Sequence, residues 1–346
     1  MLFFQCDYVE GAHPNIIKKL GETNFDQTPG YGADKYCIEA SEKIKAAAGV
    51  PEADVHFLVG GTQANLIAIS SILKPYQGVI SHKDGHINVH ETGAIEATGH
   101  KVLALGGSDG LLDAGDVDKY ISNHFSLSTH EHCVMPGMAY ISFPTESGTL
   151  YSKKQLTDLY SVCRKHSVPL FIDGARLGYG ITSPNCDLTL EELASLCDMF
   201  YIGGTKCGAL FGEAIVITDK TLQKDFRYNI KQRGAMLAKG RLLGIQFAEL
   251  FRDGLYFDIC GRATELALKI REAFEHSGIK MYSASPTNQQ FPILTDEQID
   301  YFKKKYVFEI EDRLDDNHTV VRFCTSWATK EENVDKLISS IKNMPV

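Results

Sequence analysis

Short apolar segments alternate with longer segments of helical period through the first two thirds of this chain. The apolar segments are four to six residues long, are rich in β-branched and aromatic residues, and are bounded by Gly, Pro, Asp or Thr, as buried strands are. We predict strands at Val55–Val59, Gly78–Ser81, Lys101–Leu105, Met138–Phe143, Pro169–Asp173, Met199–Gly203 and Ala214–Thr218. We predict helices at Thr62–Leu73, His90–Thr98, Ala114–Asn123, Lys153–His166 and Leu190–Cys197. This alternation predicts an α/β fold in which helices cover both faces of a mostly parallel sheet.

The pattern changes after about Thr218. A long helix-forming stretch, broken near Gly254, runs from about Arg233 to Phe274, and a weaker mixture of strands and helices follows. In this tail we predict strands at Ile279–Tyr282 and Val320–Thr325 and a closing helix at Glu331–Lys342. A chain of 346 residues exceeds the size of one small core. We therefore predict a large domain at 1–240, which includes the N-terminal segment, and a smaller C-terminal α+β domain at 241–346.

Charge and cysteine content limit the classes of function. The net charge of −9 gives the chain no electrostatic attraction for nucleic acid or for an anionic membrane surface. The nine cysteines include no Cys-x-x-Cys pair, which argues against a disulfide framework and a zinc knuckle and favours a reducing compartment. The N-terminus lacks the basic region of a secretory signal, and no run of 18 apolar residues exists. We expect a soluble, cytoplasmic protein.

A glycine-rich turn follows the first predicted strand and opens a predicted helix; its residues are Gly60-Gly61-Thr62-Gln63-Ala64-Asn65. Free N–H groups and the dipole at a helix N-terminus bind phosphate, and glycine lets the anion approach the backbone closely. Thr62 adds a hydroxyl donor. The alternative is an ordinary strand–helix turn in which Thr62 caps the helix. The glycine spacing matches neither a P-loop nor a dinucleotide-binding fingerprint.

An acid, Asp173, ends another predicted strand, in the segment Phe171-Ile172-Asp173-Gly174-Ala175-Arg176. Open α/β sheets bind ligands at this edge, where a carboxylate can serve as a metal ligand, a base or a partner for a cationic ring. The alternative is an aspartate that caps a helix. Arg176 can bind a carboxylate through two hydrogen bonds, or it can simply pair with Asp173.

A lysine, Lys206, follows a third strand, in the segment Ile202-Gly203-Gly204-Thr205-Lys206-Cys207-Gly208. A lysine between glycines is usually a solvated loop residue. A partly buried lysine near other cations, however, has a lowered pKa and becomes a good Schiff-base nucleophile. The three segments together supply a phosphate cradle, an acid and a lysine at one sheet edge, and this set is what pyridoxal 5′-phosphate (PLP) requires.

Three histidines at a spacing of four residues, His82, His86 and His90, are candidates for a metal site on one helix face. Asp84-Gly85 lies between them and breaks a helix, which disfavours a shared face. We therefore expect no metal.

The sequence resembles the threonine aldolase group of fold-type-I PLP enzymes, in the β-eliminating lyase superfamily, and within it the branch of low-specificity L-threonine aldolases and phenylserine aldolases. The resemblance runs nearly end to end. The segments that carry it are Asp7-Tyr8, Pro29-Gly30-Tyr31-Gly32, Gly61-Thr62-Gln63-Ala64-Asn65, His86 with Glu91-Thr92-Gly93-Ala94, Asp173-Gly174-Ala175-Arg176, Gly203-Gly204-Thr205-Lys206, Gly212-Glu213-Ala214-Ile215 and Val320-Val321-Arg322-Phe323.

The resemblance implies a role for each matching residue. Lys206 would hold PLP as a Schiff base, and Asp173 would pair with its ring nitrogen. The phosphate would bind Gly61, Thr62 and Thr205, and His86 would stack on the ring and could act in acid–base chemistry. The substrate carboxylate would bind Arg176 and Arg322.

One position departs from part of the family. Where some threonine aldolases carry a second active-site histidine, in the segment Phe143-Pro144-Thr145-Glu146-Ser147-Gly148, this chain has Glu146. The base that deprotonates the substrate hydroxyl is therefore His86, Glu146 or a bound water.

The implied activity is cleavage of the Cα–Cβ bond of β-hydroxy-α-amino acids, with L-threonine or L-allo-threonine giving glycine and acetaldehyde. The alternatives are a PLP-dependent β-eliminating lyase, an aminotransferase, and a PLP-binding protein without turnover. The family also implies a homodimer or homotetramer in which Tyr31 and the stretch 232–239 could reach a neighbour's cofactor.

Overall fold

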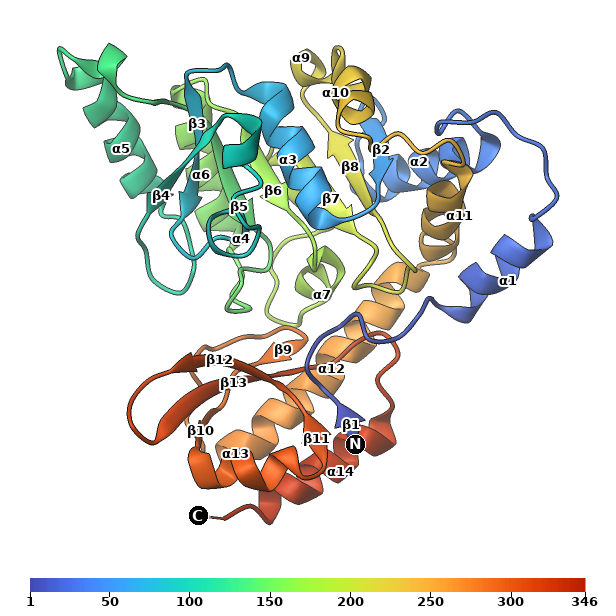
Figure 1. Cartoon of the computed structure of the whole chain (residues 1–346), viewed down its shortest axis with the longest axis vertical. Coiled ribbons are helices and arrows are strands. Elements are labelled where there is room, and N and C mark those ends of the chain that lie inside the picture. The colour runs from blue at the N-terminus through green and yellow to red at the C-terminus, as the bar shows by residue number, and fades with distance from the viewer. Residues whose placement is uncertain (346) are drawn as a thin grey trace.

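The computed structural model describes residues 1–345 and has a seven-stranded sheet at its centre (Figure 1). The strand order is β2-β8-β7-β6-β5-β3-β4, and all strands except β8 run in the same direction. The strands are β2 (Asp54–Leu58), β3 (Gln77–His82), β4 (Lys101–Leu105), β5 (Met135–Ser142), β6 (Leu170–Asp173), β7 (Met199–Gly203) and β8 (Glu213–Ile217). All seven predicted strands form, with their ends shifted by at most three residues, and the mostly parallel α/β sheet is confirmed.

Helices cover both faces of this sheet, as the alternation predicted. The helices that precede or connect its strands are α1 (Pro14–Glu22), α2 (Lys35–Ala48), α3 (Gly61–Ile72), α4 (His86–Val89), α5 (Ala114–Ser126), α6 (Lys153–Lys165), α7 (Leu177–Ile181) and α8 (Leu190–Ser195). Two short 3₁₀ turns, at Glu96–Thr98 and His130–His132, complete this part of the chain.

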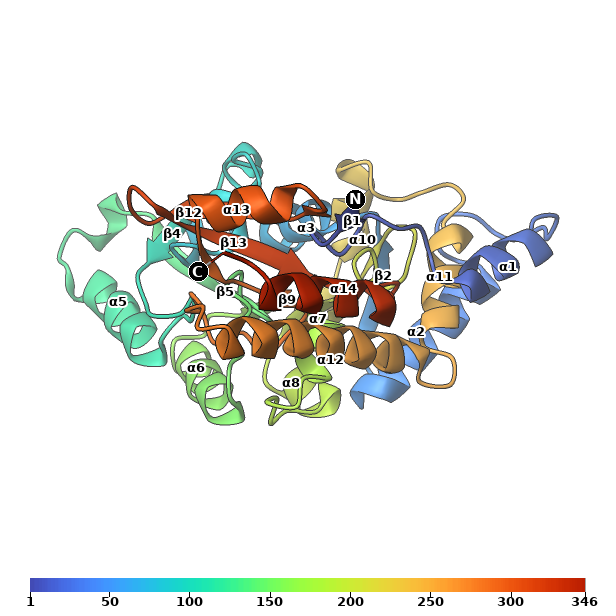
Figure 2. The same ribbon diagram turned by 90° about the horizontal axis from the view of Figure 1, so that it is seen from below.

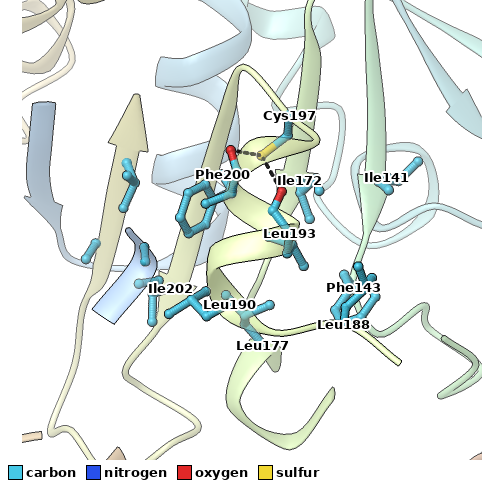
Figure 3. Packing of buried hydrophobic residues seen from close by; sticks show 14 of the residues in the cluster. Ile141, Phe143, Ile172, Leu177, Leu188, Leu190, Leu193, Cys197, Phe200 and Ile202 are labelled. Atoms are coloured by element: carbon cyan, nitrogen blue, oxygen red, sulfur yellow. Dashed lines mark hydrogen bonds between the residues drawn. The ribbon is translucent and has the colours of Figure 1, made fainter. Parts of the chain in front are cut away.

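The two faces bury different sets of side chains because neighbouring residues of a strand point to opposite sides. Ile172 of β6 lies in the cluster that includes α2, α5, α6 and α8, whereas the adjacent Phe171 lies in the cluster that includes α3 and the later helix α10 (Phe226–Gln232). Figure 3 shows the first cluster, in which Leu193 of α8 lies toward Ile172 and Phe200, and Leu190 lies toward Ile202 and Leu177. The sheet is therefore buried on both faces between two apolar layers.

The rest of the chain forms a smaller layer of strands and helices. The helices α9 (Lys220–Gln223), α10 (Phe226–Gln232) and α11 (Arg241–Leu250) still lie beside the large sheet, and the long helix α12 (Leu255–His276) leads from there into the smaller layer. The other helices of the smaller layer are α13 (Asp296–Lys303) and α14 (Glu331–Lys342). Its strands are β9 (Gln289–Gln290), β10 (Ile293–Thr295), β11 (Tyr306–Val307), β12 (Glu309–Arg313) and β13 (His318–Cys324). The N-terminal strand β1 (Leu2–Phe3) pairs with β11, so the start of the chain lies in this smaller layer (Figures 1 and 2). The domain boundary at residue 240 stays a prediction.

Three sequence-based expectations are wrong. The predicted helix at His90–Thr98 is replaced by a loop and a 3₁₀ turn, because Thr92 and Gly93 have the positive φ angles of 54° and 72°. The predicted helix from about Arg233 begins only at Arg241, while its break near Gly254 is confirmed. The segment Ile279–Tyr282 forms only an isolated bridge, between Met281 and Pro292, and no strand.

Two further findings concern residues 1–345. All nine cysteines are free thiols. None of the helices combines the length and the apolar character that crossing a membrane requires.

Candidate functional site

A cavity of about 300 Å³ lies where the parallel strands β5, β6 and β7 end. Ligands of open α/β sheets bind at this edge. The cavity brings together nearly all of the predicted site residues: Gly61, Thr62, His86, Glu146, Asp173, Arg176, Thr205 and Lys206. Arg322 does not line it. A second cavity of about 290 Å³ lies between α2 and α10 and contains none of these residues. Its lining includes Tyr31, the residue expected to reach a neighbouring subunit.

Two glycines let the ends of β6 and β7 approach each other. A Cβ atom on Gly174 would lie 1.9 Å from the backbone oxygen of Tyr201, and one on Gly203 would lie 2.2 Å from that of Ala175. The Gly203 N–H donates to the Gly174 oxygen at 2.9 Å across this contact. Glycine is therefore required at both positions, and it places Asp173 and Lys206 on the wall of one cavity.

Asp173 is buried and accepts hydrogen bonds at both carboxylate oxygens. Tyr140 and Asn65 donate to Oδ2 at 2.7 and 3.0 Å, and the Tyr201 hydroxyl and the Ala175 N–H donate to Oδ1. Burial raises the pKa of Asp173, but the charge of His86 and these hydrogen bonds outweigh it and hold the pKa below its ordinary value. Asp173 is therefore an anion on the cavity wall.

Lys206 follows β7 in a tight turn and is buried against other charges. Burial lowers the pKa of its ammonium group, and the Arg176 cation lowers it further, more than the carboxylates of Asp7 and Asp173 raise it. A larger fraction of the amine is then unprotonated and nucleophilic. The predicted amine and carboxylate therefore both line the cavity, and their roles toward a cofactor stay predictions.

The start of α3 borders the same cavity. Gly60 precedes this 12-residue helix, and no side chain caps its first N–H groups. Such groups bind an anion such as phosphate. The predicted donor Thr205 also lines the cavity, but its hydroxyl donates to Glu213 at 3.0 Å.

His86 forms hydrogen bonds with two carboxylate groups, those of Glu91 and Glu146. His86 Nδ1 lies 2.8 Å from Oε1 of buried Glu91, which also accepts from Asn65, and the His86 backbone N–H donates to Glu146 Oε1 at 2.8 Å. Burial lowers the pKa of His86, but the hydrogen bond to Glu91 and the charges of Asp173 and Glu91 raise it more, so the pKa lies above its ordinary value. His86 is therefore suited to donate a proton.

Glu146 is held at one oxygen only. The Ser142 hydroxyl donates to Oε1 at 2.6 Å, whereas Oε2 accepts no hydrogen bond from residues 1–345. Burial raises the pKa of Glu146 above its ordinary value, more than the hydrogen bond from Ser142 lowers it.

The two predicted carboxylate-binding arginines differ in their surroundings. Arg176 donates from Nε and Nη2 to the two oxygens of Asp7 at 2.7 and 3.1 Å; Asp7 is buried, and the Arg176 side chain is 17% exposed. Arg322 pairs with Glu311 at 2.8 Å, and its Nε is buried without a partner among residues 1–345. Arg176 is at the cavity, and Arg322 is outside its lining.

Replacing Asp7 with alanine should lower the free energy of unfolding by about 3 kcal/mol, because it leaves the largely buried Arg176 cation without its partner. Denaturant unfolding measures the change. The exposed pair of Lys154 and Asp158 provides the control, and Asp158→Ala should cost less than about 1 kcal/mol. Similar small losses in both variants would contradict a structural role for the buried pair.

Several residues of the site were not assigned a role from the sequence: Asp7, Asn65, Glu91, Tyr140, Ser142, Tyr201 and Glu213. Asp7, Asn65, Glu91 and Glu213 occur in the segments that carry the family resemblance, and this was the available signal. Tyr140 and Tyr201 lie inside strands, where an aromatic residue is indistinguishable from core.

Comparisons with known proteins identify the family of the chain. The sequence model of the family described as beta-eliminating lyase matches residues 4–296. The solved structure of a threonine aldolase from Leishmania major is 42% identical in sequence, covers 99% of each chain, and superposes with a TM-score of 0.96. The low specificity L-threonine aldolases of Pseudomonas sp. and Pseudomonas aeruginosa are each 25% identical over 98% of this chain and 96% of their own.

Proposed function

Because the chain belongs to the beta-eliminating lyase family, we propose that it is a PLP-dependent lyase that cleaves the Cα–Cβ bond of β-hydroxy-α-amino acids. The expected substrates are L-threonine and L-allo-threonine, and the products are glycine and acetaldehyde, since the relatives are named threonine aldolases. The observation that carries the proposal is the placement of Lys206 and Asp173 on one cavity that also contains the uncapped start of α3.

The residues of the cavity fit PLP. Lys206 is the amine that would hold it covalently, and the anion of Asp173 would face the ring nitrogen. The N–H groups at the start of α3, with Thr62, would hold the phosphate. When bound, PLP accepts the electrons of a bond that breaks at the substrate Cα.

We assign the orientation of the substrate to Arg176 and Arg322. Arg176 lies at the cavity, where its guanidinium would hold the substrate carboxylate, and Arg322 would assist from the smaller layer of the fold. Anchoring the carboxylate fixes which bond at Cα is aligned for cleavage. Asp173, whose pKa is lowered, would be ionised and would stabilise positive charge at the ring nitrogen.

Glu146 is the group that we assign to the substrate hydroxyl. Its Oε2 accepts no hydrogen bond among residues 1–345, while His86 is held by Glu91, and its raised pKa leaves a larger fraction of the imidazole protonated and unable to accept a proton. Glu146 would accept the hydroxyl proton as the Cα–Cβ bond breaks, and the backbone N–H of His86 would keep its carboxylate in place.

Replacing Glu146 with glutamine should lower turnover by about 10²-fold and should change the pH profile. A base acts in its ionised form, so wild-type turnover should rise as the pH rises through the raised pKa of Glu146. The glutamine variant should lack this rise. Glu96→Gln, which changes an exposed glutamate, should keep the wild-type profile. A wild-type profile in Glu146→Gln would assign the proton to His86 or to water.

A panel of β-hydroxy amino acids tests the proposed substrate class. Purified protein loaded with PLP would be offered threonine, allo-threonine and phenylserine in both enantiomers, and release of the aldehyde would be followed. We expect aldehyde from the L-enantiomers. Absence of aldehyde from every member of the panel would refute the assignment.

We also propose a homodimer or homotetramer. Large apolar side chains are exposed near the N-terminal segment and α10, among them Phe25, Ile38 and Tyr228, with exposures of 94%, 57% and 77%. Contact with a second copy would bury them. Tyr31, which lies under the Lys231 ammonium group, belongs to the same region and is the residue proposed to reach a neighbour's cofactor.

A further inference from the structure

Glu213 is a buried acid between two turns of the backbone. These turns border the end of the cavity that we propose to hold the phosphate. It is the first residue of β8, where it pairs with Gly203 of β7 on one side and with Leu58 of β2 on the other. Leu58 leads into the Gly60-Gly61-Thr62 turn, and Gly203 leads into the turn that contains Thr205 and Lys206. Glu213 therefore lies between the Gly60-Gly61-Thr62 turn and the turn that contains Thr205 and Lys206, and it lines the cavity.

The carboxyl group of Glu213 accepts the donors of the lysine turn. The Gly204 N–H donates to Oε2 at 3.2 Å, and the Thr205 hydroxyl donates to Oε1 at 3.0 Å. The Thr205 oxygen in turn accepts from the Gly212 N–H at 2.9 Å. A threonine hydroxyl has one proton. While that proton is donated to Glu213, Thr205 cannot donate to a phosphate.

The charge state of Glu213 decides whether Glu213 or Thr205 donates the hydrogen bond between them. Burial raises the pKa of Glu213 to about 8, against the charge of Lys206 and the hydrogen bond from Thr205. The other ionisable groups that face it are Asp173, whose charge raises the pKa, and Tyr201, whose hydroxyl stays protonated. At neutral pH Glu213 is therefore mostly protonated, and it ionises as the pH rises through 8.

We propose that protonated Glu213 is part of the phosphate-binding site and directs the hydroxyl proton of Thr205 toward the phosphate. In this form Glu213 donates to the Thr205 oxygen, so that the single hydroxyl proton of Thr205 is free for the anion. Ionised Glu213 instead accepts the hydrogen bond from the Thr205 hydroxyl, which is then not available to the phosphate, and it places a negative charge beside the phosphate. The inference rests on the proposed function, because it concerns the phosphate of PLP.

Cofactor affinity at two pH values tests the role of Glu213. The dissociation constants of PLP and of pyridoxal, which lacks the phosphate, would be measured by absorbance on the protein freed of cofactor, at pH 7 and pH 9. The phosphate of PLP stays doubly charged over this range, since its second pKa is about 6. If the phosphate binds only when Glu213 is protonated, PLP should bind about tenfold more weakly at pH 9 than at pH 7. Pyridoxal should lack this loss.

Glu213→Gln supplies the matched variant. Glutamine is neutral at both pH values and can donate to Thr205 permanently, so PLP affinity should be equal at pH 7 and pH 9. Glu96→Gln should keep the tenfold loss. The inference is overturned if PLP and pyridoxal lose affinity equally in the wild type, or if the loss persists in Glu213→Gln. Should this variant fail to fold, the wild-type comparison decides alone. Absence of PLP binding at both pH values would instead refute the proposed function.

Discussion

Replacing Lys206 with alanine should lower turnover by about 10³-fold or more and should abolish the visible absorbance of covalently bound PLP. The structure provides the reason, because the Lys206 amine is buried on the cavity wall with a lowered pKa, beside the Arg176 cation. Alanine removes the only group at this position that can bond to the cofactor. Turnover and the absorbance spectrum of the PLP-loaded protein measure both effects.

Lys220→Ala serves as the control for this substitution. Lys220 lies on α9 and forms an exposed pair with Glu52, so its loss should leave the spectrum and the turnover at wild-type values. Circular dichroism of both variants would establish that they are folded. If Lys206→Ala keeps the visible absorbance, another amine holds the cofactor and the assignment of Lys206 is wrong.

Replacing Asp173 with asparagine should lower turnover by about 10²–10³-fold, because the substitution removes the charge that would stabilise a protonated ring nitrogen. A second effect follows from the four hydrogen bonds that Asp173 accepts. The amide nitrogen of asparagine cannot accept, so it leaves buried donors unpaired. This should cost about 1–3 kcal/mol of the free energy of unfolding.

Turnover with saturating PLP separates the two effects of Asp173→Asn. Loss of turnover in protein that is folded and saturated with PLP would assign the effect to the missing charge. Asp335→Asn, on the exposed face of α14, should change neither turnover nor stability. Wild-type turnover in Asp173→Asn would contradict the role of Asp173.

The strands of the large sheet were predictable because each is a short apolar run with a clear end. Asp173 and Lys206 were predictable for the same reason, since a polar residue at the end of such a run lies at the ligand-binding edge of a parallel sheet. The loop at His90–Thr98 was not predictable from periodicity, because its conformation depends on the positive φ angles of Thr92 and Gly93.

The remainder of the site depends on tertiary contacts. Tyr140 and Tyr201 look like ordinary strand residues until the packing of β5, β6 and β7 brings their hydroxyl groups to Asp173. Asp7 reaches Arg176 across 169 positions of sequence, because the N-terminal segment passes between the two parts of the fold. No local sequence pattern indicates these contacts between distant residues. The same is true of the hydrogen bond between Glu213 and Thr205.

The most direct test of the central claim is the identity of the products formed from L-threonine. The purified, PLP-loaded protein would be incubated with L-threonine, and the products would be identified and quantified by nuclear magnetic resonance. Carbon–carbon cleavage predicts glycine and acetaldehyde in equal amounts. Formation of a 2-oxo acid with ammonia, as an eliminating lyase would give, or with an aminated PLP, as an aminotransferase would give, would contradict it. So would unchanged threonine, the result expected of a protein that binds PLP without turnover.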